Sequence, residues 1–98
     1  MVIKASTGAR VAALIADLGA SQMVVRDAAV ARLAVIGTRA VGRLLVVARD
    51  TRAPAGSRSA ALRALEAIGD PRGAAAALSL LDDREAGVAE AAVALARL

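Results

Sequence analysis

Two segments of the chain, Arg26–Gly37 (RDAAVARLAVIG) and Arg58–Gly69 (RSAALRALEAIG), are copies of one pattern. When they are aligned, an arginine, two alanines, a leucine, an isoleucine and a final glycine coincide. A third, more divergent copy begins at Val88 (VAEAAVALARL) and has Ala89 in place of the arginine. Such spacing is typical of stacked helical units, each of which buries its apolar face against its neighbours.

The segments that precede these copies also resemble one another. Each places apolar residues at positions i, i+3, i+4 and i+7, which is one face of an α-helix and does not fit a strand. Gly19, Gly37 and Gly69 follow apolar-periodic segments, where a helix C-cap favours a left-handed residue, and Asp70-Pro71 has the form of an N-cap followed by the first helical residue. The three apolar faces are Val11, Leu14, Ile15 and Leu18; Val41, Leu44, Leu45 and Ala48; and Ala74, Ala77, Leu78 and Leu81.

These patterns predict an all-α fold in a single domain spanning residues 1–98. The architecture that we expect is a short α-solenoid of three antiparallel helix pairs, because one pair alone cannot bury its apolar faces. The predicted pairs cover residues 8–36, 39–68 and 71–98. Within them the predicted helices run over residues 8–18, 22–36, 39–49, 57–68, 71–81 and 85–97.

The composition excludes several classes of active protein. The chain has no histidine, cysteine or aromatic residue, which removes the commonest general base, thiol nucleophiles, disulfides, zinc-finger ligands and base-stacking platforms. Lys4 is the only lysine that could serve as a base beside a hydroxyl nucleophile. We therefore expect no enzyme, no catalytic residue and no cofactor. The acidic cluster of Asp82, Asp83 and Glu85 could hold a hard cation weakly, but helix capping explains it better, so no metal site is predicted.

The charge balance is basic, with 13 Lys and Arg residues against 9 Asp and Glu, for a net charge of +4. All the basic residues except Lys4 are arginines, a bias that a GC-rich bacterial genome explains as well as nucleic-acid binding does. The uncharged runs are far shorter than the roughly 18 residues of a membrane-spanning helix, and the N-terminus does not have the pattern of a secretory signal. The expected location is therefore the cytoplasm.

The pattern has Val25, Arg26, Ala28, Ala29, Leu33, Ile36 and Gly37 in the first copy and Arg58, Ala60, Ala61, Leu65, Ile68 and Gly69, followed by Asp70-Pro71, in the second. It resembles HEAT repeats. It is most similar to the bacterial HEAT-like type that is also found in phycobilisome lyases. The resemblance implies an α-solenoid whose second helices line a concave face. It also implies a ladder of aspartate–arginine hydrogen bonds between neighbouring repeats, formed here by Asp17 with Arg26 and by Asp50 with Arg58, with Asp82 as a further member.

A scaffold or adaptor that binds another protein is the function that the sequence favours. The expected contact residues lie on the second helix of each pair: Arg32, Arg63, Glu66 and Arg97. The apolar ends of the stack, including the last helix, are a second expected docking surface and a route to self-association. The alternatives are an anion or nucleic-acid binder using the arginine stripe and an accessory subunit of a bilin-lyase-like enzyme. Interspersed acidic residues make nucleic acid the less favoured partner, and the lack of aromatic residues argues against a bilin pocket.

Overall fold

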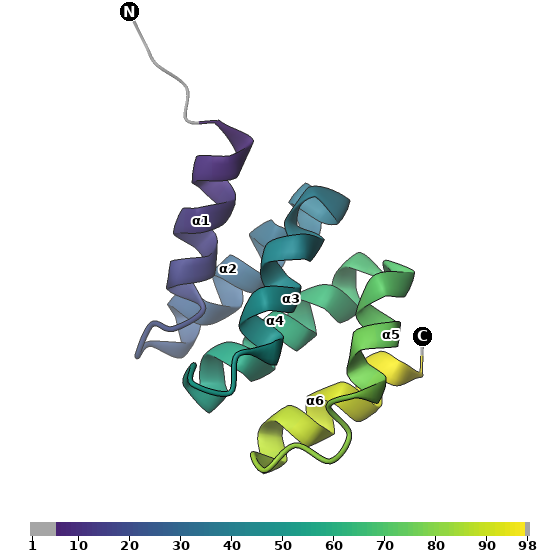
Figure 1. The fold of residues 1–98 in the computed structure, drawn as a ribbon. Helices are drawn as coiled ribbons and strands as arrows, with labels where there is room; N and C mark the ends of the chain where they lie inside the picture. The colour runs from purple at the N-terminus through teal and green to yellow at the C-terminus, as the bar shows by residue number, and fades with distance from the viewer. Residues whose placement is uncertain (1–5, 98) are drawn as a thin grey trace, which may run out of the picture.

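The computed structural model describes residues 6–97 and is helical throughout this part of the chain, with no strand (Figure 1). The all-α prediction is confirmed. Lys4, and Leu98 at the end of the predicted domain, lie outside the described residues. The elements are α1 (Thr7–Asp17), α2 (Met23–Ile36), the 3₁₀ helix η1 (Gly37–Ala40), α3 (Val41–Arg49), α4 (Ala55–Ile68), α5 (Pro71–Leu78) and α6 (Ala86–Ala96).

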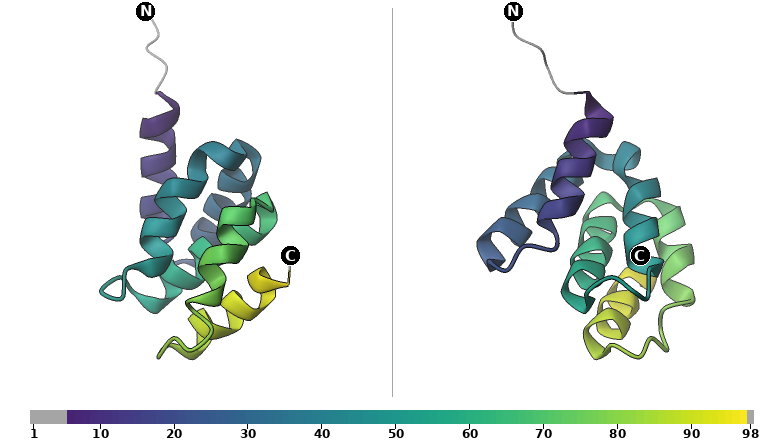
Figure 2. Two further views of the ribbon diagram at one scale, coloured as in Figure 1. Left: turned by 45° about the vertical axis from the view of Figure 1, so that its right-hand side comes forward. Right: turned by 60° about the vertical axis from the view of Figure 1, so that its left-hand side comes forward.

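The helices pack in two layers. Each odd-numbered helix contacts the even-numbered helix that follows it, and α4 contacts both α2 and α6. The helices α1, α3 and α5 form the other layer, where α3 contacts both of its neighbours (Figures 1 and 2). Helix α4 is the centre of this arrangement, because it contacts α2, α3, α5 and α6.

Small residues set the spacing between the layers. Alanine favours helix and lets helix axes approach closely, and in α4 the residues Ala60, Ala61 and Ala64 are completely buried. Leucines fill the remaining space between these alanine surfaces. Where α5 packs on α4 and α6, a Cβ added to Gly73 would lie 3.4 Å from the Cβ of Leu65 and 3.5 Å from a methyl group of Leu95, which is ordinary van der Waals contact. The backbone of α5 therefore lies close to both neighbouring helices at Gly73.

Some predicted boundaries are confirmed by their capping contacts. The Asp70 side chain accepts a hydrogen bond from the Arg72 amide at the start of α5, with Pro71 at the first helical position. Gly69 ends α4 in the left-handed conformation, and Gly37 also has a positive φ. The prediction for Gly19 is wrong, since its φ is not positive. The chain leaves α1 through 3₁₀-type bonds, such as the one from the Gly19 amide to the Ala16 carbonyl oxygen.

The third predicted apolar face is wrong in its register. Leu78 and Leu81 are 64% and 38% exposed, because α5 ends at Leu78 rather than at residue 81 and the chain then turns. The residues that face the core from this segment are Gly73, Ala76, Ala77 and Leu80. The sequence assignment followed Leu78 and Leu81, whereas the leucine that the turn after α5 brings to the core is Leu80.

Two glycine substitutions should change stability in opposite directions. Gly42 lies within α3, and a Cβ added to it would have no other atom within 4 Å, so Gly42→Ala should raise the free energy of unfolding by about 0.5–1 kcal/mol. Gly69 has φ +75°, so Gly69→Ala should lower it by about 1 kcal/mol although its added Cβ also meets no atom. Urea denaturation followed by circular dichroism measures both. Equal effects of the two substitutions would contradict an interior position for Gly42 and a C-cap position for Gly69.

Candidate functional site

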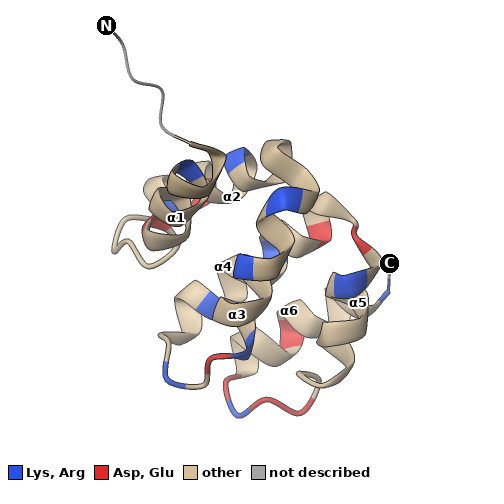
Figure 3. Cartoon of the chain, turned by 45° about the horizontal axis from the view of Figure 1, so that its top comes forward, with Lys and Arg blue, Asp and Glu red and all other residues tan. Residues whose placement is uncertain are grey.

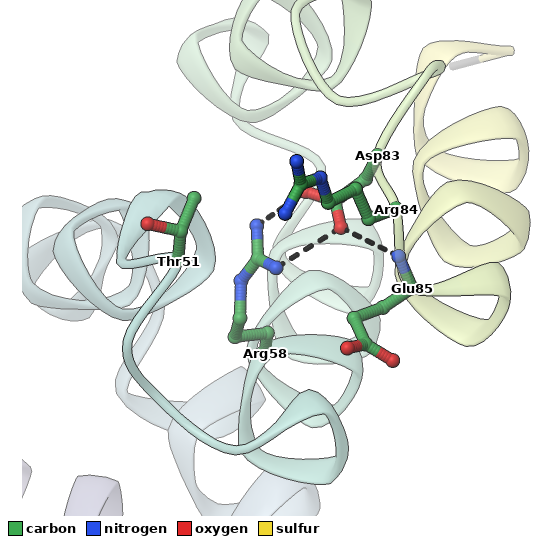
Figure 4. A pocket seen from close by; sticks show the side chains of 5 residues that line it. All are labelled: Thr51, Arg58, Asp83, Arg84 and Glu85. Atoms are coloured by element: carbon green, nitrogen blue, oxygen red, sulfur yellow. Dashed lines mark hydrogen bonds and ion pairs between the residues drawn. The ribbon is translucent and has the colours of Figure 1, made fainter.

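The most constrained polar group in residues 6–97 is the guanidinium of Arg58, in the first turns of α4. The residue is only 2% exposed. Its Nε donates to the carbonyl oxygen of Ala48 near the end of α3, at 3.0 Å. Its Nη1 and Nη2 donate to Oδ1 and Oδ2 of Asp83 in the loop between α5 and α6 (Figure 4). One side chain thus joins three segments of the chain, and its fork matches the carboxylate in the bidentate geometry.

Asp83 is held from a second side as well. Its Oδ1 accepts a hydrogen bond from the Glu85 amide at 3.0 Å, at the N-terminal cap of α6. The hydrogen bonds from Arg58, and after them the bond from the Glu85 amide, hold the pKa of Asp83 below its ordinary value. The carboxylate therefore stays ionised well into the acidic range, and the ion pair is maintained wherever the protein is folded above that pKa.

A pocket of about 270 Å³ lies over this ion pair and is lined by Thr51, Arg58, Asp83, Arg84 and Glu85. Its two buried charges, Arg58 and Asp83, are matched to each other, whereas the other two charged lining residues, Arg84 and Glu85, are exposed. Thr51 supplies the one hydroxyl of the lining, and no histidine or lysine is among the lining residues. The buried pair holds α3, α4 and the loop before α6 together.

The ladder predicted from the resemblance is corrected by these contacts. Arg58 pairs with Asp83 and not with Asp50, which instead accepts from the Arg52 amide. Arg26 donates to the carbonyl oxygens of Ala20 and Ser21 and not to Asp17. The further member Asp82 is exposed, and its neighbour forms the pair.

The physical reason for the error is the path of the loops. Asp17 ends α1 and Asp50 directly follows α3, so each precedes the helix that carries its predicted arginine partner. The carboxylate that binds Arg58 comes instead from Asp83, in the loop between α5 and α6. The sequence contains one usable signal, since Asp83 lies two residues before the N-cap of α6 and so sits in the turn that enters that helix. The repeat alignment placed Asp82 rather than Asp83 over Asp50, so it selected the wrong one of two adjacent acids.

The predicted partner-binding residues Arg32, Arg63, Glu66 and Arg97 are all exposed, but they do not form one basic stripe. Arg63 is bound to Asp27 of α2 at 3.2 Å, with both side chains about half exposed. Arg32 lines a separate shallow hollow with Arg10, Ala13, Leu14 and Asp17. Basic and acidic positions are interspersed over the helices and loops (Figure 3). The field over the second helices is therefore mixed in sign.

A third ion pair, which the sequence analysis did not predict, lies at the start of α5. The guanidinium of Arg72 binds both carboxylate oxygens of Asp70, each at 3.0 Å, and Arg72 Nη2 also approaches the carbonyl oxygen of Thr38 at 3.5 Å. These contacts lower the pKa of Asp70, with the side-chain bond to Arg72 as the largest cause. Because the arginine is largely exposed, the pair stabilises the cap only weakly.

Within residues 6–97, no group of three or more metal-ligating side chains is close enough to hold a metal ion. The acidic cluster instead divides its roles, because Asp83 binds Arg58 while Asp82 and Glu85 are exposed. None of the helices in this part of the chain is both long and apolar enough to cross a membrane. Comparison of the sequence with protein-family models and with curated proteins finds no match.

The Arg58–Asp83 pair should make stability depend on pH in a defined way. Because folding lowers the pKa of Asp83, the stabilisation is complete above the ordinary carboxyl pKa of about 4 and is lost as the pH falls through the lower value of the folded state. We expect Asp83→Asn to lower the melting temperature at pH 7 by about 5 °C or more. The difference from the unmodified protein should shrink below about pH 4.

Thermal melts from pH 2 to pH 7, followed by circular dichroism, test this expectation. Asp82→Asn is the matched control, because it makes the same change at the adjacent exposed carboxylate. A difference between Asp83→Asn and the unmodified protein that stays constant with pH, or an equal loss in Asp82→Asn, would contradict the role of Asp83 as the partner of Arg58.

Proposed function

We propose that this protein is a non-enzymatic protein–protein interaction module that acts as a scaffold or adaptor. The architecture that we propose for it is a short α-solenoid of three HEAT-like helix pairs over residues 8–36, 39–68 and 71–98. Two features support it: each odd-numbered helix packs against the even-numbered helix that follows it, and α2, α4 and α6 contact in succession. The observation on which the function rests is that apolar positions buried inside the stack are exposed at its ends.

The exposed positions at the first end are found by comparing α2 with α4. With Arg26 aligned on Arg58, Ala28 and Arg32 correspond to Ala60 and Ala64. Both alanines of α4 are completely buried in a helix that packs against α2, whereas both residues of α2 are exposed. On the same side of α2 lie Val24 and Val35, which are 80% and 88% exposed.

In the last pair, α5 and α6, an apolar residue is likewise exposed where its counterpart in α4 is buried. The third copy of the repeat places Val93 of α6 at the position of Leu62 in α4. Leu62 is completely buried, whereas Val93 is 41% exposed. Leu78, in the neighbouring α5, is 64% exposed. The side chains at both ends thus have the apolar character of an inner surface without a helix to cover them, and exposed apolar patches of this kind favour association.

A protein partner explains these surfaces better than the alternatives do. An anion or nucleic-acid binder would use the arginines of the second helices, but Arg63 is already paired with Asp27, and Glu66 and Glu90 lie exposed on the same layer. A bilin-binding role would need an aromatic lining, and the chain has no aromatic residue. We therefore propose another protein, or a second copy of this one, as the partner at an apolar end.

The double substitution Val24→Glu with Val35→Glu tests this function. It places two charges on the exposed side of α2, so a partner that docks there should be lost. Val46→Glu is the control, because Val46 is a similar valine of α3 that is 69% exposed. The measurements are the circular dichroism spectrum, sedimentation velocity over a range of concentrations, and quantitative affinity capture from the native host.

We expect all variants to remain helical, and we expect the double variant alone to lose either concentration-dependent self-association or the captured partner. A partner captured equally by the double variant and by Val46→Glu would contradict docking at this end. So would a protein that stays monomeric and captures nothing reproducibly.

A further inference from the structure

Arg26 and Arg58 occupy equivalent positions in α2 and α4, but their surroundings differ in one group. The carboxylate on Arg58 comes from Asp83, two residues before Glu85, the N-cap residue of α6. The corresponding N-cap residue of α4 is Pro54, and the residue two positions before it is Arg52. The loop between α3 and α4 therefore has a basic residue where the loop between α5 and α6 has its acid.

Arg26 is nevertheless held in a fixed orientation. Its Nη1 donates to the carbonyl oxygen of Ala20 at 2.7 Å and to that of Ser21 at 3.0 Å, both in the turn between α1 and α2. Among residues 6–97, its Nε and Nη2 have no hydrogen-bond partner, and neither atom is sealed from solvent. The guanidinium is thus anchored through one nitrogen and keeps donors available.

Arg26 lines a pocket of about 250 Å³ between the α1–α2 turn and the start of α4, which we call the Arg26 pocket. Small residues line it from both segments: Gly19 and Ala20 from the turn and Gly56 from α4. Ser57 also lines it, and its Oγ is 3.2 Å from where a Cβ on Gly19 would be. The pocket is lined by Leu18, Gly19, Ala20, Ser21, Arg26, Pro54, Gly56 and Ser57.

We propose that the Arg26 pocket binds a carboxylate, which takes the place that Asp83 occupies on Arg58. The pocket combines a guanidinium with available donors, a serine hydroxyl and no acidic lining residue. A planar carboxylate matches the fork of a guanidinium, as the Arg58–Asp83 pair in the same chain demonstrates. The source of the carboxylate is either an acidic side chain of a bound polypeptide or a free organic acid. Carboxylate binding in the Arg26 pocket is independent of docking at the apolar ends, so either proposal can be wrong without affecting the other.

The first test is a titration with sodium acetate at constant ionic strength, with sodium chloride as the balancing salt. The readout is the ¹H–¹⁵N correlation of the arginine Nε–Hε groups at pH 7. We expect the Arg26 signal to shift saturably with a dissociation constant on the order of 100 mM, because a single partly exposed ion pair contributes only about 1 kcal/mol. The Arg58 signal should not move, because its fork is already occupied.

Comparison of acetate with a peptide identifies the source of the carboxylate, and chloride and phosphate test whether a carboxylate is preferred at all. A blocked tripeptide, glycine–aspartate–glycine, that binds at least as tightly as acetate supports an acidic side chain of a polypeptide. Binding of acetate without the peptide supports a free acid. An equal response to chloride, or a stronger response to phosphate, would overturn the carboxylate assignment. In Arg26→Gln, acetate should no longer shift the backbone amide signals of residues 18–22, the turn between α1 and α2. Arg32→Gln makes the same charge change on an exposed arginine of α2, and it should leave these acetate-induced shifts intact.

The second test supplies the carboxylate within the chain. Arg52→Asp places an acid at the position equivalent to Asp83, so the melting temperature should rise and the acetate response of Arg26 should disappear. Arg84→Asp is the control, because it makes the same charge change next to Asp83, which is already paired with Arg58. It should neither raise the melting temperature nor remove the acetate response of Arg26. An Arg52→Asp variant that remains folded and still binds acetate like the unmodified protein would overturn the proposal.

Discussion

The guanidinium of Arg58 imposes the strictest requirement in this protein. It is buried in a helix that contacts four others, and a buried charge without compensation is strongly destabilising. The Ala48 carbonyl oxygen and the Asp83 carboxylate supply that compensation, and they belong to the preceding helix and to the following loop. The position of α4 is therefore tied to those of α3 and α6, and the three segments must be in register for the charge to be satisfied.

The rest of the structure can be simple because this link sets the register. Alanines bring the helices close together, and leucines fill the space between them. The proposed binding sites lie where this repeated packing is interrupted. At the ends of the stack, residues such as Val24, Val35 and Val93 are exposed where their inner counterparts are covered, and at Arg26 a guanidinium lacks the acid that its counterpart has. Both proposals thus come from positions where the repeat is incomplete.

The repeat itself could be predicted from the sequence, because helical periodicity and the Asp70-Pro71 and Gly69 caps are local signals. The all-helical fold and most helix positions follow from them. The partner of Arg58 could not be predicted, since it depends on how far a loop of the next pair reaches, and two adjacent aspartates compete for that role. The inner face of α5 was misassigned because Leu78 and Leu81 fit the helical spacing, but α5 ends at Leu78 and the chain then turns, so that Leu80 is buried in their place.

We expect Arg58 and Asp83 to act as one unit that joins α4 to the loop between α5 and α6. A double-mutant cycle with Arg58→Met, Asp83→Ala and the combined variant, measured by thermal unfolding, tests the coupling most directly. We predict strong non-additivity, with the combined variant melting no lower than the less stable single variant, because each single substitution leaves the other charge buried and uncompensated. Losses that simply add in the combined variant would contradict a coupled unit.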